Sequence, residues 1–115
     1  MANLPVVQIG KHLEKLAKKH MTCYYSDITA KFGLPFLDGA WDSHDLSKIF
    51  EILDQEDADK NRPFRTSVVI SKEFNKPGPG YFAAMSRFKS KHTSTETQRD
   101  ALWLNELSKT FAYKW

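Results

Sequence analysis

The chain has 115 residues, enough for one domain with one hydrophobic core, which we expect to span residues 1–115. Eight Phe, four Tyr and three Trp argue against a disordered chain. No apolar stretch approaches the roughly 18 residues that span a bilayer, and charge resumes at Lys11, too early for a secretory signal, so we expect no membrane partner. A single cysteine, Cys23, cannot form an internal disulfide, which favours a reducing, cytoplasmic location.

The net charge of +3 hides a segregation of charge along the chain. Residues 21–59 carry nine acids and two lysines, whereas residues 60–92 carry eight bases and one acid. Either the two blocks are solvated faces that pair with each other in three dimensions, or each sign has its own partner. Charge blocks this short are common on solvated surfaces, so we favour the first interpretation.

Two helices are expected at the start of the chain. Over about residues 7–21, apolar residues recur at helical spacing and lysines fill the opposite face, which predicts an amphipathic helix. A short helix follows, with Ser26 as its N-cap. It is expected to stop at Gly33, because Pro35 bars its continuation.

A third helix is predicted over residues 43–57, with Asp42 or Ser43 as its N-cap. Its apolar stripe, at positions i, i+3, i+4 and i+7, is the clearest helical pattern in the chain: Leu46, Ile49, Phe50 and Leu53.

After Pro63 the pattern changes from helical to extended. Residues 64–71, FRTSVVIS, are rich in β-branched side chains and predict a strand. The turn-forming residues 72–80, KEFNKPGPG, then separate this strand from a second expected strand, YFAAMSRF. Together they predict a β-hairpin over residues 64–88. Beyond it, Thr95 and Gln98 predict a capping box. The final helix carries an apolar stripe: Leu102, Trp103, Leu107, Phe111 and Trp115.

The order of three helices, a hairpin and a helix predicts an α+β fold, a winged helix-turn-helix domain. Three segments also resemble those of small winged-helix proteins of bacteria, phages and mobile elements: RPFRTSVVISKEFNKPGPGYF, YYSDITAKFGL and ALWLNELSKTFAYKW. The resemblance covers about residues 24–115 and contains no catalytic motif. It implies the winged-helix fold and a context linked to nucleic acid or to defence.

Nucleic-acid binding is the first functional hypothesis, with DNA favoured over RNA as the partner. The helix over 43–57 would enter the major groove in such a fold, but its acids would be repelled by phosphates, although His44 and Lys48 could reach base edges. The basic hairpin is the better candidate for phosphate contacts. Its expected contacts are Arg62, Arg65, Lys72, Lys76, Arg87, Lys89 and Lys91. A solvated hairpin whose lysines protect an exposed edge is the equal alternative.

Protein binding is the second hypothesis. The acidic helix could occupy a basic protein surface, as a phage-type anti-defence inhibitor would, through Asp45, Glu51 and Asp54. The favoured alternative is that these acids only keep the face soluble. Trp41 is either an anchor for the partner or a core residue. A third possibility is a homodimer through the final helix, where Tyr113 and Trp115 exceed what one helix face buries.

Catalysis is not expected. His20 and Cys23 are three residues apart, but no further ligands complete a metal site, and Cys23 is more simply a small buried residue. The PGPG segment lacks the Gly-Lys-Ser/Thr ending of a phosphate-binding loop. We therefore expect no enzyme, no cofactor and no metal.

Overall fold

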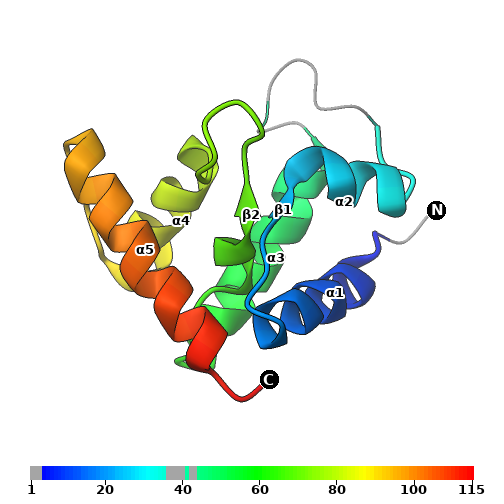
Figure 1. The fold of residues 1–115 in the computed structure, drawn as a ribbon, viewed down its shortest axis with the longest axis horizontal. Coiled ribbons are helices and arrows are strands. Elements are labelled where there is room, and N and C mark those ends of the chain that lie inside the picture. Colours follow the sequence, from blue (N-terminus) through cyan, green and yellow to red (C-terminus); the bar gives the residue numbers. More distant parts are fainter. Residues whose placement is uncertain (1–3, 36–40, 42–43) are drawn as a thin grey trace.

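A computed structural model describes residues 4–35, 41 and 44–115 of the chain. This part forms five α-helices, one 3-10 helix and two short strands, in the order α1 (Val6–Lys18), β1 (Cys23–Tyr24), α2 (Tyr25–Lys31), α3 (Asp45–Asp59), η2 (Arg65–Val68), β2 (Val69–Ile70), α4 (Pro79–Lys89) and α5 (Glu96–Ala112). The strands lie side by side near the centre, with α1 and α2 on one side and α4 and α5 on the other (Figure 1). None of the described helices has the length and apolar character to cross a membrane.

The prediction of a winged helix-turn-helix fold is wrong. The two strands pair in parallel, Cys23 with Val69 and Tyr24 with Ile70, and α2 and α3 lie between them in the chain. Residues 64–88 are all described and contain β2 as their only strand, because the second expected strand belongs to α4. There is therefore no hairpin between 64 and 88, and the expected wing does not exist.

Burial on every side explains why residues 64–71 do not form a long strand. Helices α1, α3 and α5 all pack against η2, and every residue of η2 is buried. Side chains from these helices bond its backbone: Asp57 Oδ2 accepts from the Arg65 N–H at 2.9 Å, and Trp103 Nε1 donates to the Ser67 carbonyl at 2.9 Å. A backbone satisfied by side chains needs no neighbouring strand, so packing overrides β-propensity here.

Helix α4 replaces the second expected strand for two reasons. Pro79 occupies the first turn, where a missing N–H costs no helical hydrogen bond and the fixed φ suits the helix. Tyr81 and Met85, four residues apart, are buried beside Phe64. Tyr81, Met85 and Phe88 follow the spacing i, i+4, i+7, which is typical of a helix. The prediction of a strand here did not take this spacing into account.

The other helices lie close to their predicted positions, with shifted ends. Helix α1 ends at Lys18, earlier than expected, and His20 takes a left-handed conformation with φ 55°. The N-cap of α2 is Tyr24 and not Ser26, whereas Gly33 beyond its end has the expected left-handed φ of 67°.

The caps of α3 and α5 show how side chains define helix ends. The N-cap of α3 is His44, whose Nδ1 accepts from the Leu46 N–H at 3.0 Å; the expected caps Asp42 and Ser43 lie outside the described residues. The capping box of α5 is confirmed, because the Gln98 N–H donates to Thr95 Oγ1 at 3.1 Å and the Thr95 N–H donates to Gln98 Oε1 at 3.3 Å.

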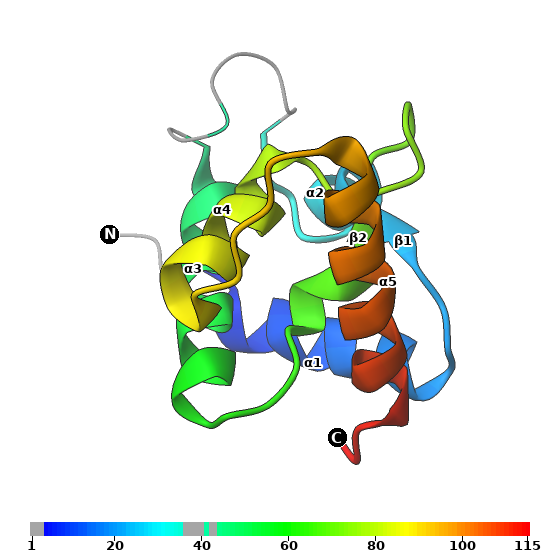
Figure 2. The same ribbon diagram turned by 90° about the vertical axis from the view of Figure 1, so that its left-hand side faces the viewer.

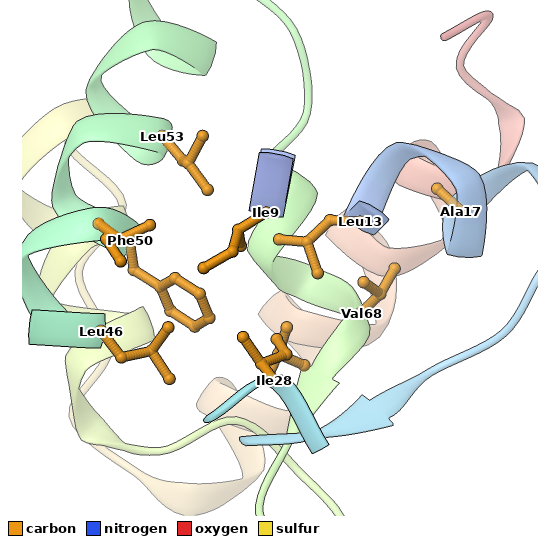
Figure 3. Packing of buried hydrophobic residues seen from close by; sticks show 10 residues of the cluster. Ile9, Leu13, Ala17, Ile28, Leu46, Phe50, Leu53 and Val68 are labelled. Carbon is orange, nitrogen blue, oxygen red and sulfur yellow. The ribbon is translucent and has the colours of Figure 1, made fainter. Parts of the chain in front are cut away.

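Two apolar clusters form the core. In the larger cluster, side chains of α1, α2, α3 and η2 converge (Figure 3): Ile9, Leu13, Ala17, Ile28, Leu46, Phe50, Leu53 and Val68. The smaller cluster joins Phe64, Tyr81 and Met85, with half-buried residues of α5 packed against it. Because η2 and its flanking residues contribute to both clusters, this short segment connects the two halves of the fold.

Candidate nucleic-acid interface

Five of the seven basic residues expected to contact phosphates form ion pairs within the chain: Arg62, Arg65, Lys76, Arg87 and Lys89. The other two, Lys72 and Lys91, are exposed and have no described carboxylate within ion-pair distance. Arg62, Arg65 and Arg87 pair with acids of residues 21–59, whereas Lys76 and Lys89 pair with acids of α5. The acidic and basic blocks of the sequence therefore neutralise each other only in part.

The most buried of these ion pairs centres on Asp57. Its side chain is fully buried and accepts from Arg65 Nε at 3.1 Å and from Arg62 Nε at 2.6 Å. Arg65 is only 3% exposed, and its Nη1 donates to Glu14 Oε2 on α1 at 2.9 Å. A guanidinium this buried cannot reach a phosphate backbone, so Arg65 stabilises the junction of α1, α3 and η2.

Lys89 and Lys76 link α5 to the rest of the molecule. Lys89 Nζ donates to Glu106 Oε2 at 2.7 Å and to the Arg62 carbonyl at 3.0 Å, and it lies 4.4 Å from the centroid of the Phe64 ring. Lys76 Nζ donates to Glu96 and Asp100, each at 2.9 Å. Both amines thus hold α5 in place.

Arg62, Lys89 and Lys91 are the predicted residues that the structure brings closest to a common site. They line a hollow of about 370 Å³, where Lys109 of α5 joins them. Glu106 also lines this hollow, paired with Lys89.

The two residues predicted to reach base edges, His44 and Lys48, lie at the start of α3 and differ in their roles. Besides capping α3, His44 bonds the Pro35 carbonyl through Nε2 at 2.9 Å, so both of its ring nitrogens are engaged within the fold. Lys48 is exposed.

The residues predicted for a protein partner do not form one exposed acidic face. Asp54 is 3% exposed and accepts from Thr66 Oγ1 at 2.7 Å, and Glu51 pairs with Arg87 at 2.9 Å. Asp45 lies in the first turn of α3, where a carboxylate interacts favourably with the helix dipole. Trp41, Glu51 and Asp54 instead line a cleft between α3 and α4.

The largest group of basic residues without described partners lies on α1 and its C-cap. Six of the seventeen Lys and Arg side chains form ion pairs, and eleven have no described carboxylate within 4.0 Å. Four of these eleven follow one exposed side of α1 and its C-cap, the lysine face: Lys11, Lys15, Lys18 and Lys19. Glu14, the single acid of this helix, pairs with Arg65.

The positive charge continues onto the end of α2. His12 packs edge-on against Phe32 with ring centroids 5.8 Å apart. Burial lowers the pKa of His12, and the positive charges of Lys31 and Lys15 lower it further. Because Lys31 directly precedes Phe32, the contact between Phe32 and His12 places the end of α2 beside α1.

The His20 and Cys23 pair does not form a reactive site. The His20 ring stacks on Phe111, with centroids 5.1 Å apart. Burial raises the pKa of the Cys23 thiol to about 12, and the Asp27 carboxylate adds to this shift. Across the described residues, no group of three or more His, Cys, Asp or Glu side chains could hold a metal ion.

The aromatic residues of the final helix mostly contact their own chain. Trp103 Nε1 bonds Ser67, and Trp115 Nε1 donates to the Thr110 carbonyl at 2.8 Å, while the Trp115 ring lies 5.4 Å from the Arg62 guanidinium. The exposed apolar residues that remain here are Leu104 and Tyr113. The apolar surface proposed for a homodimer is thus smaller than the sequence indicated.

Comparisons of the chain with protein-family models, with curated proteins and with solved structures found no match.

Neither the lysine face nor Lys109 was expected from the sequence to belong to a site. The signal for the lysine face was present, since lysines recur opposite the apolar stripe of the first helix. The sequence could not show that these amines lack carboxylate partners among the described residues, whereas most bases of residues 60–92 form ion pairs.

Proposed function

We propose that the chain binds the phosphate backbone of nucleic acid through the lysine face of α1. The observation that carries this proposal is the absence of any described carboxylate within 4.0 Å of Lys11, Lys15, Lys18 or Lys19, although most bases of residues 60–92 are paired. Neutralisation of phosphates by free lysines supplies most of the affinity of sequence-independent binding.

The spacing of the lysine face suits a phosphate strand. At 3.6 residues per turn, its members lie within an arc of about 100° around the helix axis. From Lys11 to Lys18 the face is about 10 Å long, which corresponds to about three base-pair steps of one strand. Lys31 directly precedes Phe32, which packs against His12, and adds a further exposed positive charge beside α1.

Burial on the opposite side of α1 holds this surface in place. Ile9, Leu13 and Ala17 are fully buried in the larger core cluster, so the helix cannot rotate about its axis (Figure 3). The packing of α1 therefore fixes the positions from which the four lysine side chains extend into solvent. Contacts from such side chains to the phosphate backbone of nucleic acid position a protein without recognising sequence.

The experiment compares two quadruple variants with equal loss of charge. The first replaces the lysine face with glutamine: Lys11→Gln, Lys15→Gln, Lys18→Gln and Lys19→Gln. The matched control replaces four other exposed lysines that have no described carboxylate partner: Lys48→Gln, Lys72→Gln, Lys91→Gln and Lys109→Gln. Affinity for a labelled random duplex is measured by fluorescence anisotropy at low salt.

We expect the first variant to bind at least tenfold more weakly than the control variant, because both lose the same net charge and only the first loses the lysine face. Equal affinities for the two variants would show that net charge alone attracts the duplex. A greater loss in the control variant would place the interface at the control lysines, of which Lys48, Lys72 and Lys91 were predicted from the sequence.

A further inference from the structure

A small cleft lies between α3 and α4, which pack side by side (Figure 2). It encloses about 160 Å³. Asp54 and Thr66 line it at its buried end, and the ion pair between Glu51 and Arg87 lies at its exposed end, where the two side chains are 52% and 67% exposed. No residue of α1 lines this cleft, so it is separate from the lysine face.

The Asp54 carboxyl lacks a cationic partner. All Lys, Arg and His residues of the chain are described, and none forms an ion pair with Asp54. Its one hydrogen bond within the described residues comes from Thr66 Oγ1, which donates to Oδ1. The nearby cations are already engaged: Arg65 with Asp57 and Lys89 with Glu106. A buried carboxylate without a partner is costly, so an occupant that supplied a positive charge would be stabilised here.

Aromatic side chains form the walls of the cleft. Trp41 lies with its ring centroid 5.5 Å from that of Tyr25 and 6.0 Å from that of Phe50, and Tyr81 and Phe88 line the side formed by α4. The Tyr25 hydroxyl accepts from the Gly78 N–H at 2.9 Å, which fixes the ring. Faces of Trp, Tyr and Phe attract cations, and they do so more strongly where water is excluded.

We propose that this cleft binds a small organic cation, an alkylammonium or guanidinium group, with Asp54 as its anionic partner and the aromatic walls around its carbon atoms. The enclosed volume matches such a group, since a cavity of about 150 Å³ accommodates a molecule the size of benzene. A charge-assisted hydrogen bond to Asp54 would complete the pairing that the chain itself leaves open.

Binding should strengthen as pH rises. Burial raises the pKa of Asp54 well above its usual value of 3.8, the Thr66 hydrogen bond opposes this shift, and the Asp57 charge adds to it. A cation pairs with the ionised carboxyl, so Asp54 must release a proton on binding at low pH. The titratable and charged groups around it are Asp57 on α3, Arg65 on η2, Lys89 and Tyr81 on α4, Tyr25 on α2, and Glu51 and Arg87 at the mouth.

The indole N–H of Trp41 provides a local reporter. Trp103 and Trp115 bond backbone carbonyls elsewhere, whereas Trp41 Nε1 lies beside Gly80 at the cleft. Its NMR signal is assigned with Trp41→Phe and followed during titrations with n-butylammonium and n-butylguanidinium chloride. 1-Butanol serves as the neutral probe of the same chain length.

We expect a saturable shift of the Trp41 signal with both cations, at least tenfold weaker binding in Asp54→Asn, and no change in Asp59→Asn, an exposed acid on the same helix. Affinity in the wild-type chain should also rise from about pH 5 to about pH 8, a test that requires no variant. Equal affinity for 1-butanol, no saturable shift with either cation, or unchanged binding in Asp54→Asn would each overturn the proposal.

A free amine and a side chain of another protein carry the same chemical group. Nα-acetyl-arginine amide distinguishes them, because its backbone must also fit at the mouth between Glu51 and Arg87. If Nα-acetyl-arginine amide binds as tightly as n-butylguanidinium, the result supports an arginine side chain of another protein as the ligand. If only n-butylguanidinium binds, the result supports a small molecule.

Discussion

Arg65 and Asp57 form an ion pair in the interior, with Arg65 3% exposed and Asp57 0% exposed. The Asp57 carboxylate accepts both from the guanidinium and from the backbone N–H of Arg65, so it positions the side chain and the start of η2 together. Arg62, Glu14 and Glu56 belong to the same network, which joins residues 51 positions apart in the chain.

Loss of the Asp57 charge should strongly destabilise the fold. Asp57→Asn leaves two guanidinium groups without their buried partner, and removal of one member of a buried ion pair typically costs about 3–5 kcal/mol. The free energy of unfolding from urea titration measures this effect. Asp59→Asn, an equal charge change at an exposed position of the same helix, should shift it by less than about 0.5 kcal/mol. Similar values for the two variants would show that the network contributes little.

A side chain at position 80 should destabilise the fold, whereas a side chain at position 78 should be tolerated. A Cβ at Gly80 would lie 2.6 Å from Trp41 Nε1, but one at Gly78 would meet no atom closer than 3.7 Å. Overpacking of this kind costs about 1–3 kcal/mol, so Gly80→Ala should lower the free energy of unfolding by about that amount. Gly78→Ala, at an ordinary φ of −75°, is the control. A Gly80→Ala chain as stable as Gly78→Ala would indicate that Trp41 does not pack on α4.

Asp54 should make the fold less stable as pH rises. Burial raises its pKa in the folded chain, so between its usual value of 3.8 and the raised pKa the folded state binds more protons than the unfolded state. The free energy of unfolding therefore falls with rising pH across that window. Asp54→Asn does not titrate, so its stability relative to the wild type should increase from about pH 4 to about pH 8. Parallel stability curves for the two chains would contradict this prediction.

The Cys23 thiol should react slowly. With a pKa raised to about 12, it is almost entirely protonated at pH 8, and only the thiolate attacks a disulfide. We expect reaction with a disulfide reagent to be at least about a hundredfold slower in the folded chain than in urea. Comparable rates in the two states would mean that Cys23 is not shielded by the fold.

Helices whose apolar residues pack into a single core were predictable from the sequence. The stripe Leu46, Ile49, Phe50 and Leu53 identified α3, and Thr95 with Gln98 located the start of α5. Local patterns were sufficient at these positions because the same residues determine both the helix and its packing.

The predictions of the two hairpin strands were wrong for different physical reasons. Residues 64–71 have β-branched composition, but contacts with three helices decide their conformation, and those contacts are not encoded locally. For α4, the prolines and glycines of PGPG are typical of a turn, although Pro79 can equally begin a helix.

The candidate interface was only partly predictable, because a sequence gives charges but not their partners. Arg65 and Glu14 are far apart in the chain, and only the fold shows that they pair. Conversely, nothing in the sequence distinguishes the unpaired Lys11 from the paired Lys76. The sequence therefore favoured the block of bases over 60–92, although most of these bases are paired and four unpaired lysines lie together on α1 and its C-cap.

The salt dependence of duplex binding tests the central claim most directly. Each phosphate neutralised by a lysine contributes about 0.9 to the slope of log affinity against log salt concentration. We predict that glutamine at all four positions of the lysine face lowers the magnitude of this slope by about 2 to 4, whereas the control with Lys48, Lys72, Lys91 and Lys109 replaced keeps a slope close to that of the wild type. An unchanged slope after replacement of the lysine face would contradict the account.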